Sequence, residues 1–190
     1  MTAPTGLHYF PDALTEKEHN SLVKWLERQE LTPITASENS RRVAQFGSRY
    51  DYSSKGTVGD AEPIPTELEL LLDRLNDFLE FKRRKNCDVA PWFDQCLVNR
   101  YLPGQGISAH IDSPKSFKSV VCCFTLGSGA TMKFTHPTKG DYSLYTEPRS
   151  LYVMTKESRY EWKHQMTARK SDPGHGERGV RWSVTFRATK

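Results

Sequence analysis

A histidine and an aspartate stand two positions apart near the middle of the chain, as His110 and Asp112. If this segment is a strand, both side chains project from one face, because successive side chains of a strand alternate between its two sides. An imidazole nitrogen and a carboxylate oxygen that meet at one point are suitable ligands for a divalent metal ion. Such a pair also arises by chance, or as two residues that hydrogen-bond to each other at the end of a loop, so a third ligand is needed.

A candidate third ligand is His164, which lies in a segment with an alternating pattern. Alternation predicts four side chains on one face of the expected strand: Tyr160, Trp162, His164 and Met166. A lone histidine on such a face is usually a core residue. With His110 and Asp112, however, it completes a set of two histidines and one carboxylate, which leaves positions open on an octahedral metal and suits Fe(II) that activates oxygen. The same set on zinc, in a hydrolase, is the competing interpretation.

The expected C-terminal strand carries two arginines on one face. Alternation predicts four residues on that face: Arg181, Ser183, Thr185 and Arg187. Burying two arginines beside a metal is unfavourable unless they meet anions, and a dicarboxylate would pair with both. Asn99 and Tyr101 share a face of an earlier strand and could donate to the same ligand. The alternative is that this strand face is exposed and its arginines are solvated. That alternative accounts for either arginine separately, but less well for both arginines together with the asparagine, the tyrosine and the metal-ligand candidates.

Helices and strands must position these residues. A capping box of Thr15 and Glu18, followed by an apolar stripe, predicts a helix over residues 16–29, and a stripe of leucines predicts one over 66–85. From residue 92 onward the apolar pattern has a period of two, which is typical of strands. The candidate strands are 93–101, 107–112, 119–126, 130–135, 142–146, 149–154, 158–166 and 180–188. Helices followed by eight short strands indicate an α+β protein with a sandwich or jelly-roll core.

Length and composition indicate one globular domain. The chain has 190 residues, of which 36% are hydrophobic and 26% charged, and we expect helices in residues 1–91 and the strand-rich core in 92–190. We expect no secretory signal, no membrane span and a monomer. The four cysteines form no C-x-x-C pair and are expected to be free thiols, which favours an intracellular protein of the cytoplasm or nucleus: Cys87, Cys96, Cys122 and Cys123. The net charge of +4 is compatible with a nucleic-acid partner but does not argue for one.

Several motifs together resemble the AlkB family of Fe(II)/2-oxoglutarate-dependent dioxygenases, over about residues 92–188. The matching pieces are Asn-x-Tyr at 99–101, Tyr-x-Pro-Gly at 101–104, His-x-Asp at 110–112, His164 after Ser158-Arg159-Tyr160, and Arg-x-Ser-x-Thr-Phe-Arg at 181–187. Their combined order and spacing are far more specific than His-x-Asp alone.

The resemblance implies a double-stranded β-helix that holds iron between its sheets, and a reaction that consumes 2-oxoglutarate and O₂. It implies that three residues bind Fe(II): His110, Asp112 and His164. It implies that a second group binds 2-oxoglutarate: Asn99, Tyr101, Arg181, Ser183 and Arg187.

An N-terminal segment rich in arginines and aromatic residues would correspond to the family's nucleotide-recognition lid. Its candidate substrate-binding residues are Arg42, Phe46, Arg49, Tyr50 and Tyr52. Aromatic residues between basic ones can stack on exposed bases while the cations bind phosphates. Further cations favour the same partner: Lys163, Arg169, Lys170 and Arg178. The alternative is the edge of a sheet with solvated arginines.

The resemblance favours oxidation of a nucleic-acid base, with RNA, including tRNA, preferred to single-stranded DNA. We expect oxidative demethylation of an N-methylated base. One alternative is hydroxylation of a modified wobble uridine, because segments 41–47, 103–112 and 149–155 look like the tRNA-directed branch of the family. Another is hydroxylation of a protein side chain by the same fold. Pro114 stands where the bacterial repair enzymes carry an acidic residue that reads the damaged base, which argues against direct DNA repair.

Overall fold

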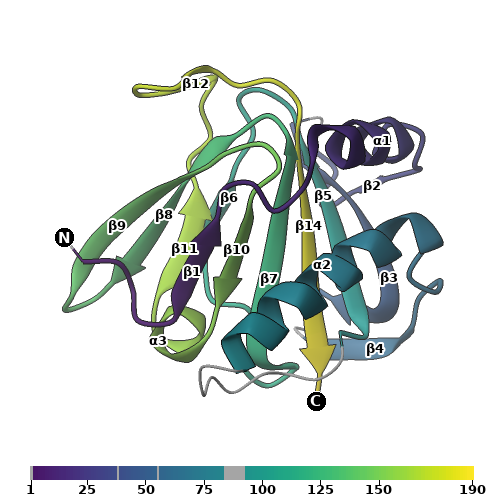
Figure 1. The fold of residues 1–190 in the computed structure, drawn as a ribbon, viewed down its shortest axis with the longest axis horizontal. Helices are drawn as coiled ribbons and strands as arrows, with labels where there is room; N and C mark the ends of the chain where they lie inside the picture. The colour runs from purple at the N-terminus through teal and green to yellow at the C-terminus, as the bar shows by residue number, and fades with distance from the viewer. Residues whose placement is uncertain (1, 38, 55, 84–92) are drawn as a thin grey trace.

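Two antiparallel sheets face each other in the computed structural model, which describes residues 2–37, 39–54, 56–83 and 93–190 (Figure 1). The strands of the large sheet are β1 (Leu7–Phe10), β2 (Thr32–Pro33), β3 (Arg42–Asp51), β4 (Gly56–Asp60), β5 (Gln95–Tyr101), β7 (Phe117–Gly127), β10 (Leu151–Met154) and β14 (Arg181–Thr189). They follow the order β1-β10-β7-β14-β5-β3-β2, and β4 pairs with β3. This sheet forms one wall of the jelly roll.

The small sheet forms the other wall. Its strands are β6 (Ile107–His110), β8 (Ala130–His136), β9 (Gly140–Thr146) and β11 (Lys163–Met166), in the order β6-β11-β8-β9. A separate two-stranded ribbon, β12 (Ser171–Asp172) and β13 (Gly176–Glu177), projects from one end. The architecture confirms the predicted jelly roll.

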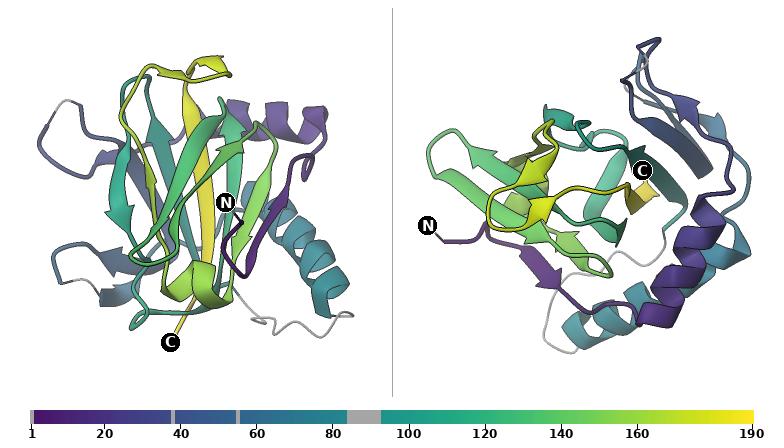
Figure 2. Two further views of the ribbon diagram at one scale, coloured as in Figure 1. Left: turned by 90° about the vertical axis from the view of Figure 1, so that its left-hand side faces the viewer. Right: turned by 90° about the horizontal axis from the view of Figure 1, so that it is seen from above.

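Two helices cover the outer face of the large sheet, α1 (Glu16–Leu26) and α2 (Thr66–Arg83) (Figure 2). The central strand β14 alternates as predicted, because its even-numbered residues Trp182, Val184 and Phe186 join the helix leucines in one core cluster. A second apolar cluster lies between the sheets and includes Val121 and Phe134. The odd-numbered face of β14 is therefore turned toward the space between the two sheets.

The capping box places the start of α1. The backbone N–H of Thr15 donates to the Glu18 carboxylate at 2.8 Å, and the N–H of Glu18 donates to the Thr15 hydroxyl at 3.3 Å. Glu18 also pairs with Arg74 of α2 at 2.5 Å, which ties the two helices together. Helix α1 ends at Leu26 rather than at residue 29. The predicted end of α2 at residue 85 lies outside the described residues.

The predicted strand over 158–166 is wrong in its first half. The helix α3 (Lys156–Tyr160) occupies that part, and only β11 is a strand. The backbone N–H of Thr155 donates to the Ser158 hydroxyl at 3.1 Å, and this local bond favours a helical turn. As a result Tyr160 is 39% exposed and does not share the face of His164, whereas Trp162 is buried.

Other segments differ in smaller ways. Residues 7–10 form β1 and residues 56–60 form β4, and neither segment is among the candidate strands from the sequence. No helix of the described residues is long and apolar enough to cross a membrane. Cys96, Cys122 and Cys123 are buried free thiols, as expected. Cys87 and the expected boundary at residues 91–92 lie outside the described residues.

The segment that carries the β12–β13 ribbon is anchored by one carboxylate. The Arg178 Nε and Nη2 atoms donate to Asp172 at 2.5 and 2.9 Å, and Arg169 reaches the same carboxylate at 2.7 Å. Burial alone would raise the pKa of Asp172, but its bonds from Arg178 and Thr131 outweigh this and hold the pKa well below its usual range. Arg178 is thus a buried structural cation rather than a surface contact for nucleic acid.

Candidate active site

A cavity of about 470 Å³ lies between the two sheets. Ten of the residues singled out from the sequence line it: Tyr50, Tyr52, Asn99, Tyr101, His110, Asp112, His164, Arg181, Ser183 and Arg187. They come from β3, β5, β6, β11 and β14 and the segments next to these strands. Strand alternation therefore brings together residues from distant parts of the chain.

Two histidines and an aspartate meet at one end of this cavity. His110 ends β6 and is paired directly with His164 of β11, which brings their ring centroids to 4.3 Å. The His164 Nε2 atom lies 3.5 Å from Oδ2 of Asp112. One ligand atom from each of the three residues lies within 4.8 Å of the others, close enough to hold one metal ion.

The histidine ring of His110 has a fixed tautomer. Its Nδ1 atom lies 2.8 Å from the backbone carbonyl oxygen of Ser108, and a carbonyl can only accept, so Nδ1 carries the proton. Nε2 then keeps its lone pair and would be the atom available to a metal ion. Burial and the neighbouring His110 lower the pKa of His164 to about 3, so this ring is neutral at neutral pH, as a metal ligand must be.

The aspartate is kept ionised by its neighbours, Arg187 foremost. Burial would raise the pKa of Asp112, but the Arg187 guanidinium, 2.6 Å from Oδ1, acts with His164, His110 and Arg159 to outweigh burial and lower the pKa to about 2. Arg187 thereby occupies one carboxylate oxygen, while Oδ2 faces His164. This division presents one oxygen of Asp112 to a metal.

Arg159 is a functional residue that the sequence reasoning missed. It lies in α3, is 1% exposed, and donates to four backbone carbonyls of the segment after the aspartate: Asp112 at 2.7 Å, Lys118 at 3.2 Å, Phe117 at 3.3 Å and Ser113 at 3.4 Å. It therefore fixes the backbone that carries Asp112. The sequence contains Arg159 within the Ser-Arg-Tyr motif, but nothing in its type or spacing signals which carbonyls it meets.

The β14 wall of the cavity, from Arg181 to the Asp112-paired Arg187, suits a dicarboxylate. Arg181 and Arg187 are 3% and 7% exposed, and the Nε atom of each has no hydrogen-bond partner among the described residues. Arg181 donates to the Thr125 hydroxyl at 3.0 Å and lies 5.7 Å from the Tyr101 ring centroid. Burial raises the pKa of Tyr101, so its hydroxyl remains a donor. Two buried guanidinium groups with unused donors are the chemistry that an anionic cosubstrate with two carboxylates needs.

Two tyrosines lie beside the metal-ligand set. The ring centroids of Tyr50 and Tyr52 are 5.4 Å apart in an edge-on arrangement, and Tyr50 lies 5.4 Å from Phe117. Tyr52 lines the cavity and is 38% exposed, so this aromatic edge connects the cavity to the surface.

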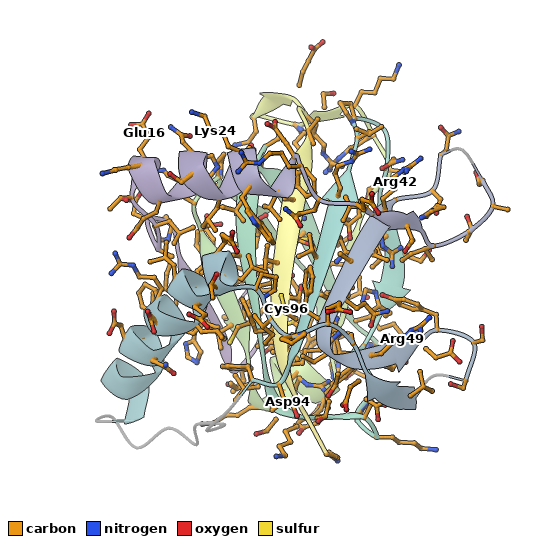
Figure 3. The ribbon with its side chains drawn as sticks, turned by 90° about the vertical axis from the view of Figure 1, so that its right-hand side faces the viewer. Glu16, Lys24, Arg42, Arg49, Asp94 and Cys96 are labelled. Atoms are coloured by element: carbon orange, nitrogen blue, oxygen red, sulfur yellow. The ribbon has the colours of Figure 1, made fainter. Side chains whose placement is uncertain are left out.

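Three other residues of the same segment do not line the cavity. Phe46 packs into the core beneath the helices, and Arg42 lies opposite Arg100, because even-numbered residues of this part of β3 face away from the cavity. Arg49 is exposed, and Figure 3 shows it at the other end of β3 from Arg42. The sequence reasoning took the segment as one surface and did not separate its two faces. Arg41, which belongs to the 41–47 motif but is not among the candidate substrate-binding residues, lines the cavity instead.

Comparisons with known proteins agree with this geometry. A family model described as the 2OG-Fe(II) oxygenase superfamily matches residues 6–187. The tRNA (carboxymethyluridine(34)-5-O)-methyltransferase ALKBH8 of Macaca fascicularis is 34% identical over 98% of this chain, which spans only 31% of that protein. An uncharacterized protein, L905, of Acanthamoeba polyphaga mimivirus is 31% identical over 96% of this chain and 84% of its own. The solved structure of OsALKBH1 superposes with a TM-score of 0.71 at 18% identity, over 98% of each chain.

Proposed function

The chain belongs to the 2OG-Fe(II) oxygenase superfamily, with AlkB-family proteins among its relatives, and from this premise we propose that it oxidises a base of RNA. As an enzyme of this superfamily it uses Fe(II), 2-oxoglutarate and O₂.

We assign Fe(II) to His110, Asp112 and His164, and the carboxylates of 2-oxoglutarate to Arg181 with Asn99, Tyr101, Ser183 and Arg187. When bound, the iron and cosubstrate together supply oxidation of a substrate C–H bond by O₂. Arg187 helps to keep Asp112 ionised and, by pairing with Oδ1, would leave Oδ2 for the metal. Ser108 holds the proton of His110 on Nδ1. The cavity walls restrict which C–H bond can approach.

The observation that carries an RNA substrate is the aromatic edge of Tyr50 and Tyr52 next to the metal-ligand set. Aromatic side chains stack on unpaired bases, and a base must leave its helical stack to reach an enclosed site. The cavity lies between two sheets, so only a protruding group of this kind could enter. The partly exposed Tyr52 would be the first contact of an incoming base.

Two reactions fit this substrate. Oxidation of an N-methyl group gives a hydroxymethyl product that releases formaldehyde, which is demethylation. Oxidation of a carbon on a uridine side chain gives a stable alcohol, and the 34% identity to a relative named for a tRNA uridine derivative supports uridine as the base in this second case. Because the chain spans less than a third of that relative, the methyl transfer in the relative's name is not carried over.

The test is incubation of the purified protein with Fe(II), 2-oxoglutarate and either bulk tRNA or methylated oligonucleotides, followed by mass spectrometry of the nucleosides. Loss of a methylated nucleoside with release of formaldehyde supports demethylation, and a uridine derivative that gains one oxygen supports hydroxylation. The variant His110→Ala is the control for metal-dependent chemistry. Unchanged nucleosides together with an oxidised peptide in a protein extract would replace the proposal with protein hydroxylation.

A further inference from the structure

Arg41 connects the segment before β3 to a residue at the cosubstrate end of the cavity. It lines the cavity, is partly buried, and its Nε atom donates to the side-chain oxygen of Asn99 at 3.0 Å. We propose that Arg41 is a positioning residue that sets the orientation of the Asn99 amide and thereby the affinity for 2-oxoglutarate. This inference rests on the proposed role of Asn99.

The hydrogen bond selects one of the two orientations of the Asn99 amide. A guanidinium group has only donors, so it must face the amide oxygen, and a flipped amide would set donor against donor. With the oxygen held by Arg41, the amide nitrogen is turned toward Ser183, whose hydroxyl lies 3.4 Å away on the cavity-lining face of β14. A donor on that side has the polarity that a carboxylate ligand requires. Without Arg41 the amide could turn in either direction, because the final torsion of asparagine is soft and nearly two-fold.

A second set of contacts holds the segment that carries Arg41. The side-chain nitrogen of Gln105 donates to the carbonyls of Asn39 and Ser40 at 3.0 and 3.2 Å. The amide oxygen of Gln105 accepts the N–H of Leu102 at 2.9 Å. Gln105 thus fastens this segment to the turn that follows β5, the strand that carries Asn99. Arg41 is therefore held in place before any ligand binds. Such pre-organisation allows one residue to position another.

The charge of Arg41 acts in the same direction. Burial raises the pKa of Tyr101, and the positive charges of Arg41 and Arg181 oppose that rise, so both cations lie close enough to act on the Tyr101 hydroxyl. Arg41 therefore adds positive potential where a dianionic cosubstrate would bind.

The test measures binding rather than turnover. The protein is loaded with Mn(II) under nitrogen, so that no oxidation occurs, and titrated with 2-oxoglutarate by calorimetry. We expect Arg41→Ala to weaken binding about tenfold, as the loss of one hydrogen bond from a charged donor implies. The matched control is Arg42→Ala, which removes the same charge from the next residue, whose side chain bonds to the Leu31 carbonyl outside the cavity. We expect Arg42→Ala to change the affinity less than twofold.

A double-mutant cycle separates positioning from direct attraction. If Arg41 acts through Asn99, then Arg41→Ala should change the affinity little in a protein that already carries Asn99→Ala. A full tenfold effect in both backgrounds would overturn the positioning role. Arg41→Gln, which keeps a hydrogen-bond donor without the charge, should recover part of the 2-oxoglutarate affinity. This variant also keeps the test valid if Arg41→Ala does not fold.

The outcomes also separate this inference from the proposed function. A wild-type protein that binds 2-oxoglutarate, with Arg41→Ala and Arg42→Ala equal to it, would refute the role of Arg41 alone. A wild-type protein that binds 2-oxoglutarate equally well after Asn99→Ala would instead refute the assignment of Asn99, on which the inference rests.

Discussion

Replacing Arg159 with methionine should weaken both the fold and the metal site. Methionine fills a similar volume but donates no hydrogen bonds, so the carbonyls of Asp112, Ser113, Phe117 and Lys118 would lose the cation that they share. These carbonyls lie where Arg159 is 1% exposed, so water has little access to replace the lost donors. The substitution Arg159→Met therefore removes a polar anchor without opening a large cavity.

The size of the effect follows from the contacts. The two shortest of the four bonds measure 2.7 and 3.2 Å, and a hydrogen bond to a charged group contributes about 1.5–3 kcal/mol. The buried methionine side chain would recover roughly 1–2 kcal/mol through apolar burial. We expect a net loss of about 3 kcal/mol in the free energy of unfolding, which for a domain of this size lowers Tm by roughly 6–12 °C.

The assay is thermal and urea unfolding of the variant, with and without Mn(II). Binding of Mn(II) to the folded state stabilises it according to its affinity. If the hydrogen bonds from Arg159 to the backbone around Asp112 also hold the Asp112 carboxylate in its metal-binding position, Mn(II) should raise the Tm of Arg159→Met less than that of the wild type. The matched control is Arg28→Met at an exposed position just after α1, which should stay within about 0.5 kcal/mol of the wild type. A loss below about 1 kcal/mol in the free energy of unfolding of Arg159→Met would refute this account of the Arg159 hydrogen bonds.

Three further substitutions test other parts of the molecule. His110→Ala should abolish succinate formation while Tm of the metal-free protein stays close to that of the wild type, and turnover at the wild-type rate would contradict the metal assignment. Tyr52→Ala should weaken binding of single-stranded RNA by about 1–3 kcal/mol in fluorescence anisotropy, through lost stacking, and leave 2-oxoglutarate binding unchanged; an equal RNA affinity would remove the aromatic edge from the substrate site. Asp172→Asn should destabilise the protein at pH 7 by roughly 2–3 kcal/mol. The pKa of Asp172 is depressed in the folded state, so its contribution to stability is present above the unfolded-state pKa of about 3.9 and is lost as pH falls through the folded-state pKa. In urea titrations, the difference in unfolding free energy between variant and wild type should therefore shrink below about pH 4. A difference that does not depend on pH would contradict the ion pair.

The sequence predicts which residues of each strand share a face, and from this most of the site follows. Alternation alone placed Arg181 and Arg187 on one face of β14, and it brought His164 to the metal-ligand set although the segment before it is helical. These predictions succeed because one face of each strand must be apolar, which fixes the direction of every other side chain.

Residues whose role depends on a distant partner could not be predicted in this way. Arg159 and Arg41 act through carbonyl and amide oxygens of other elements, and neither the residue type nor the spacing names those partners. Phe46 shows the opposite failure, because an aromatic residue among arginines looks like a base-stacking group until the pairing of β3 with β5 assigns its face. Long-range pairing is the information that the local pattern lacks.

The position of β14 has a consequence for how the molecule is made. Residues 181–189 leave the ribosome after every other strand of the large sheet, yet they lie at its middle, between β7 and β5. Until they arrive, β5 and β7 each keep an unpaired edge, and the two halves of the sheet have no common partner. The strand also brings Arg181 and Arg187, so closing the sheet and completing the anion site are the same event. A nascent chain that still lacks this strand should therefore be most vulnerable to aggregation and should have no affinity for its cosubstrate.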